Sequence, residues 1–182
     1  MPNNSGILDK LYKSDDVVSM IPSKIGNAPY LWVYNPRLPK SKDDLAVPDD
    51  LPTIWNDICA KGHPTLSDIN NIAVQFNILS GKWLVFVSPD KVDNLWERIV
   101  ESTLAGGLGD RAKISTRRPG AKSSDNHVIW VYNTDYRSVK EVLRVRAELR
   151  RLGVKESISY KPDIYTLLGI HTNNNFFNPP SS

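Results

Sequence analysis

The segment 79–132 constrains the fold most, because it places one long amphipathic helix between two strand patterns. Residues 82–88 and 127–133 are rich in branched and aromatic side chains, which is typical of strands. Between them, Ser88 and Pro89 can begin a helix. The helix is indicated by an apolar stripe at helical spacing, made by Val92, Leu95, Trp96, Ile99 and Val100. The glycines at 106, 107 and 109 predict its end.

The remaining patterns predict an α+β fold. Strands are expected at 30–34, 113–118, 158–160 and 164–168, and helices at 7–21, 51–60, 66–76 and, capped by Asp135, at 137–152. A Pro119-Gly120 turn makes 113–133 a hairpin, so we expect a curved, mainly antiparallel sheet with helices packed on its convex face. The other, concave face would be free to form a ligand cleft. Trp83 and Trp96 are expected in the core.

Length and composition predict one globular domain. With 182 residues and 40% hydrophobic content, the chain is expected to form a single domain at 30–170, after an N-terminal helix and lead-in at 1–29 and before a disordered tail at 171–182. The net charge of +3 does not by itself indicate a polyanionic partner. Positive charge nevertheless gathers in the C-terminal half.

Several function classes are not expected. The single Cys59 excludes a disulfide within the chain and is predicted to be a buried small hydrophobe, consistent with a reducing compartment. No signal peptide or membrane-spanning segment is recognisable, so a cytoplasmic or nuclear protein is expected. The three histidines lie far apart without a nearby nucleophile, which predicts no catalytic site, no metal and no cofactor.

The predicted hairpin carries the candidate binding residues. Lys113, Arg117, Arg118 and Lys122 follow one another without an intervening acidic residue, and Trp130 lies on the next strand. Cations beside an exposed aromatic ring can hold a phosphate chain and stack a base. The alternatives are that the cations form a solvated hairpin and that Trp130 packs in the sheet.

Four motifs resemble those of the cap-binding translation initiation factor 4E family: GKW at 81–83, LWE at 95–97, the basic hairpin with Trp130, and a long helix followed by SY at 159–160. Within that superfamily the chain looks closer to the uncharacterised basophilic leukemia-expressed protein family. This closer resemblance is carried by LSGKW at 79–83, YKPDIYT at 160–166 and LGI at 168–170. It covers about 30–170 and implies a 4E-like fold.

The resemblance also implies a binding role. Cap-binding members hold a methylated guanine between two Trp rings and grip its phosphates with Arg and Lys, which corresponds to Arg117, Lys122 and Trp130 here. The segments 36–52 and 62–80 contain no Trp, so the sandwich is incomplete and tight cap binding is not expected. The leading hypothesis is therefore a non-enzymatic protein that binds RNA or a phosphorylated nucleotide.

The alternative is a protein-interaction adaptor that has lost nucleotide binding. Trp55 matches the partner-binding Trp of the first helix in the 4E family. The apolar anchor after the second helical Trp is replaced, because Glu97 and Arg98 follow Trp96. A charge at that position would reject the usual partner helix, so a different protein partner is expected through this helical surface.

Overall fold

The computed structural model describes residues 21–26, 28–39, 46–117, 120, 122 and 125–170. The predicted disordered tail at 171–182 and Arg118 lie outside these residues, as does the predicted helix at 7–21 apart from its last residue.

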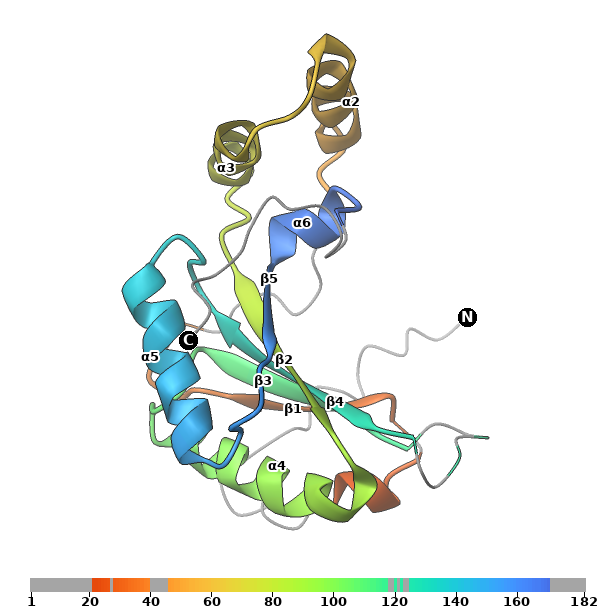
Figure 1. Ribbon diagram of the computed structural model, residues 1–182, viewed down its shortest axis with the longest axis vertical. Coiled ribbons are helices and arrows are strands. Elements are labelled where there is room, and N and C mark those ends of the chain that lie inside the picture. The colour runs from red at the N-terminus through yellow and green to blue at the C-terminus, as the bar shows by residue number, and fades with distance from the viewer. Residues whose placement is uncertain are drawn as a thin grey trace.

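The centre of the described part is a five-stranded antiparallel sheet (Figure 1). Its strand order is β1-β3-β4-β2-β5, with β1 (Tyr30–Tyr34), β3 (Arg111–Ser115), β4 (His127–Asn133), β2 (Gly81–Val87) and β5 (Ser159–Pro162). Every neighbouring pair of strands is antiparallel. The predicted α+β class and the β3–β4 hairpin are therefore confirmed.

Helices α4 (Pro89–Leu104) and α5 (Val139–Arg151) pack on one face of the sheet. A hydrogen bond of 2.6 Å from Ser102 Oγ to Glu148 Oε1 joins the two helices. Figure 1 shows α2 (Leu51–Lys61) and α3 (Leu66–Gln75) beyond one end of the sheet, near α6 (Asp163–Leu167). The short 3-10 helix η3 (Pro22–Lys24) precedes β1 and contacts α4.

Local sequence accounts for the helix starts. Ser88 is the N-cap of α4 and a proline follows it, where the missing N–H costs nothing. Thr65 caps α3 through a capping box: its hydroxyl accepts from Asp68 N at 3.2 Å, and the Asp68 carboxylate accepts from Thr65 N at 2.8 Å. The box satisfies two backbone N–H groups at the start of α3.

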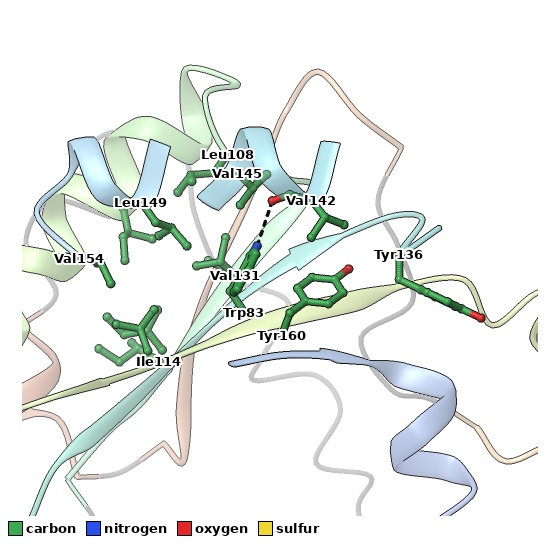
Figure 2. Close-up of a cluster of buried hydrophobic side chains, with 14 of the residues drawn as sticks. Trp83, Leu108, Ile114, Val131, Tyr136, Val142, Val145, Leu149, Val154 and Tyr160 are labelled. Carbon is green, nitrogen blue, oxygen red and sulfur yellow. Dashed lines mark hydrogen bonds between the residues drawn. The ribbon is translucent and has the colours of Figure 1, made fainter. Parts of the chain in front are cut away.

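The core fills the space between the sheet and α4 and α5. Trp83 is buried, and its indole Nε1 donates to the Val142 carbonyl of α5 at 3.2 Å (Figure 2). The Tyr160 ring packs edge-on against the same indole, with centroids 5.0 Å apart. Trp96 is also buried. Both tryptophans are core residues, as their apolar surroundings in the sequence predicted.

Two predicted elements near the C-terminus are wrong in type or boundary. Residues 164–168 do not form a strand: Asp163–Leu167 is the helix α6, and Ile164 and Tyr165 are buried within it. The predicted helix at 137–152 begins at Val139. Asp135 instead accepts from the Arg137 N–H at 2.9 Å and so closes the turn before the helix.

Two further expectations need correction. The strand predicted at 113–118 lies at Arg111–Ser115, where it pairs with β1 from Tyr30 to Tyr34. Cys59 is exposed and not buried as predicted, because the side chains of α2 that contact the core are Leu51, Ile54, Trp55 and Ile58.

Candidate functional site

The face of the sheet opposite α4 and α5 carries rows of aromatic and cationic side chains that run across the strands. In the middle row Trp32 of β1 pairs with Lys113 of β3, which pairs with Trp130 of β4. Side chains directly opposite one another on neighbouring strands lie within contact distance. The row therefore places one ammonium between two indoles.

Lys113 lies within an aromatic cage, which we define as Tyr30, Trp32 and Trp130. Its Nζ is 4.6 Å from the Tyr30 ring centroid, 4.8 Å from that of Trp32 and 4.9 Å from that of Trp130. Tyr30 and Trp130 meet edge to face at 82°, with centroids 5.7 Å apart, and so form a corner. All three rings are half-buried. The geometry is that of a cation held by several ring faces.

The next row is more deeply buried. Tyr34, Arg111, Tyr132 and Lys82 follow one another across β1, β3, β4 and β2. The Arg111 guanidinium lies 4.2 Å from the Tyr132 ring centroid and is ion-paired with Asp110. Burial raises the pKa of the Tyr132 hydroxyl well above its ordinary value. This second face was expected to be free, but around Arg111 and Tyr132 it is closed to solvent.

A buried ion pair fixes the edge of this row. Asp163 is fully buried; its carboxylate accepts from Lys82 Nζ at 2.6 Å and from Ser80 Oγ at 2.5 Å. Burial, and then the charge of Lys82, lower the pKa of the neighbouring Lys161. The sequence phrases at 79–83 and 160–166 are thus joined directly in the tertiary structure.

A cavity of about 520 Å³ lies where β3 ends and β4 begins. Arg117 and Lys122 line it, together with the hydroxyl-bearing residues Ser23, Ser115 and Thr116. Asp125 is also in the lining, and its carboxylate accepts from the Lys122 backbone N–H at 3.0 Å. Two of these hydroxyls already have acceptors, since Ser23 Oγ donates to Asp93 and Thr116 Oγ1 donates to the Ala28 carbonyl. The cavity therefore offers mainly the two cationic side chains, which suit a phosphate group.

The cavity and the aromatic cage lie next to each other. Ser115 and Val128 line the cavity, and each is two residues along its strand from Lys113 or Trp130. Residues separated by two positions point to the same face and lie about 7 Å apart. A ligand a little longer than this can contact both places at once.

The structure brings together most of the predicted site residues. Lys113 and Trp130 are cross-strand neighbours, and Arg117 and Lys122 share the adjacent cavity. Trp55 lies apart from them: it is half-buried on α2, and Figure 1 shows this helix beyond the opposite end of the sheet from the β3–β4 loop.

Sequence reasoning missed the aromatic residues of β1 as site residues. Tyr30, Trp32 and Tyr34 alternate along the strand and so share one face. That period of two was a usable signal, because it leaves Leu31 and Val33 for the core and sends three rings to the other side.

Neither a metal site nor a membrane-spanning helix is found among the described residues. No three or more His, Cys, Asp or Glu side chains among them come together as a metal site. In the same part of the chain, no helix combines the length and hydropathy needed to cross a membrane.

The fold and site define a class: an α+β domain built on one antiparallel sheet, with one helix-covered face and one face carrying aromatic and cationic rows. The chain belongs to the family of the basophilic leukemia-expressed protein Bles03, whose sequence model matches residues 41–169. The predicted family is therefore confirmed.

A solved structure is also similar to this chain: the complex of C. elegans eIF4E-3 with the 4E-binding protein Mextli and a cap analog. The two chains are 18% identical, with a TM-score of 0.42 over 57% of this chain. The match spans 58% of the other chain. A likeness at this level carries no conclusion about ligand or partner.

Proposed function

We propose that this protein binds RNA or a phosphorylated nucleotide without transforming it. A base would rest against the half-buried rings of the aromatic cage, and a phosphate would enter the cavity lined by Arg117 and Lys122. The observation that supports this most is the adjacency of the two features along the sheet, because Ser115 and Val128 of the cavity lie two residues from Lys113 and Trp130 on β3 and β4.

The charges and donors of the cavity fit this proposal. Arg117 and Lys122 are both exposed, so their cationic groups are accessible to a ligand from solvent. The guanidinium offers a planar pair of donors and the ammonium a compact charge, a combination suited to phosphate oxygens. Stacking of a base on an aromatic side chain contributes about 1 to 3 kcal/mol and tolerates any base. We therefore expect weak sequence preference.

The first test is a fluorescence titration of the full chain with capped and uncapped RNA at several salt concentrations. Each phosphate contact is expected to contribute roughly 0.7 to the negative slope of log K against log salt for a single strand. Replacing Arg117 with Ala should reduce that slope by about this amount and weaken all RNA sequences similarly.

Lys140→Ala is the matched control for Arg117→Ala. Lys140 is exposed on α5, which packs on the other face of the sheet, so its replacement should leave binding unchanged apart from a small general charge effect. Absent binding, or binding that does not respond to salt, contradicts the proposal. Equal effects of both substitutions would place the phosphates outside the cavity.

A second candidate function is protein interaction through α2 and α3. Within α2, all of whose residues are described, Leu51 is the one buried side chain and Trp55 is half-buried. On α3, Leu66 and Val74 are 41% and 52% exposed. Exposed apolar side chains and a half-buried Trp on two successive helices are features of partner-binding surfaces.

Co-purification separates this function from RNA binding. A protein partner retained after nuclease treatment and lost with Trp55→Ala would support it, with Asn56→Ala, an exposed neighbour on the same helix, as control. Because Trp55 also packs against the core, circular dichroism must show that the variant is folded. A partner that is lost from the wild-type protein after nuclease treatment would be held through RNA, which supports RNA binding.

A further inference from the structure

The aromatic cage already holds a cation of the protein itself. Lys113 Nζ lies between 4.6 and 4.9 Å from all three ring centroids, and the corner made by Tyr30 and Trp130 closes around it. Attraction of a cation to a ring face is strongest at such a point, where several faces converge. The position at which a ligand cation would gain most from this cage is therefore occupied.

The sheet register keeps the ammonium there. Lys113 is the direct cross-strand partner of both Trp32 and Trp130, so its stem rises between the two indoles and its head reaches their faces. Lys113 also interacts with other groups, and only the position of its ammonium matters for the exclusion of a ligand. An incoming cation would have to displace this ammonium or lie beside a like charge.

We propose that Lys113 determines the specificity of the site: by occupying the aromatic cage it excludes cationic rings and quaternary ammonium groups, so the site accepts phosphorylated ligands whose base is neutral. This inference rests on the proposed function and adds the charge class of the base. A neutral base can stack on the rings without competing for the cation position, and its phosphate enters the cavity lined by Arg117 and Lys122.

The inference requires a comparison of two ligands that differ in one positive charge. Guanosine triphosphate and N7-methylguanosine triphosphate share every group except the methyl and the charge that it places on the ring. Intrinsic tryptophan fluorescence reports binding, because Trp32 and Trp130 are two of the five tryptophans and line the cage. The full chain is used throughout.

Lys113→Met is the main variant, since methionine is similarly long and unbranched but uncharged. The wild-type protein should bind the methylated nucleotide no more tightly than the unmethylated one. In Lys113→Met the ratio of the two affinities should shift roughly tenfold toward the methylated nucleotide. Lys140→Met, a surface lysine on α5, should keep the wild-type ratio.

Two results would overturn the inference: a wild-type protein that prefers the methylated nucleotide tenfold, or a Lys113→Met ratio equal to that of wild type. A melting curve checks that the variant is folded. If Lys113→Met does not fold, Lys113→Gln replaces it, and the wild-type comparison decides by itself if neither folds.

A third probe separates this inference from the proposed function. Tetramethylammonium carries the cation but no phosphate, so it addresses the cage alone. If neither nucleotide binds any variant, the proposed function fails. Saturable quenching by tetramethylammonium in Lys113→Met and not in wild type would then still support occupancy of the cage by Lys113. The same response in both proteins would refute it.

Discussion

The Lys82–Asp163 pair offers a sharp test of how the second face is held in place. The Asp163 side chain is fully buried and that of Lys82 is 12% exposed, with 2.6 Å between Nζ and the carboxylate. Removing one partner of such a pair leaves a buried charge uncompensated, which costs about 3 to 5 kcal/mol. We expect this loss in the free energy of unfolding for Lys82→Met.

Asp163→Asn should cost a similar amount, because the amide no longer balances the ammonium. In the wild-type protein Ser80 Oγ donates to the Asp163 carboxylate at 2.5 Å, and the oxygen of the Asn amide can still accept this hydrogen bond. The loss in the free energy of unfolding should therefore lie near 3 kcal/mol, at about the lower limit of the expected range. For a chain of this size, 3 to 5 kcal/mol corresponds to a fall in Tm of roughly 6 to 20 °C.

Urea denaturation of wild type, both single variants and the double variant measures the coupling between the two charges. The double variant buries no unpaired charge, so it should be less destabilised than the sum of the singles by about 2 kcal/mol or more. The reasoning is refuted if each single substitution costs under about 1 kcal/mol and the two effects add.

Two other predictions concern close packing and pH. Gly109→Ala should destabilise by about 3 kcal/mol or more in a urea titration, since a new Cβ would lie 1.7 Å from the Tyr132 carbonyl oxygen; Gly26→Ala, where the nearest atom is 3.7 Å away, should be nearly neutral. The hydrogen bond from Arg151 lowers the pKa of Glu148 to about 2, from an ordinary 4.5. Its stabilisation is therefore present above pH 4.5 and lost as the pH falls toward 2, so the stability difference between wild type and Glu148→Gln should close over that range. A difference that stays constant with pH would contradict this assignment.

Much of the fold could be predicted from local sequence patterns. The helical stripe of α4 and the runs of branched and aromatic residues in β2 and β4 each form the expected element, and the two strands lie within one residue of their expected bounds. The exception at 164–168 is informative: five apolar or small residues in a row fit either a strand or a buried helix. In the structure these residues form a helix, and its first residue, Asp163, accepts hydrogen bonds from Ser80 and Lys82, which are distant in sequence.

The candidate site could be predicted only in part. The cations and Trp130 were visible because they follow one another along the hairpin, but the contribution of β1 was not, since its neighbour in the sheet is not its neighbour in sequence. The prediction that Cys59 is buried was wrong for a similar reason. A helix shows from its sequence which side is apolar, but not how deeply its remaining side chains are buried.

The sequence by itself determined the antiparallel α+β class, the core tryptophans and the family, because strand-forming runs, helical spacing and short motifs are properties of contiguous residues. Only the tertiary structure decided that Trp32 and Trp130 would flank Lys113 and that Asp163 would meet Lys82. These contacts depend on strand order and register, which are set by the packing of the whole chain and cannot be read from any one segment.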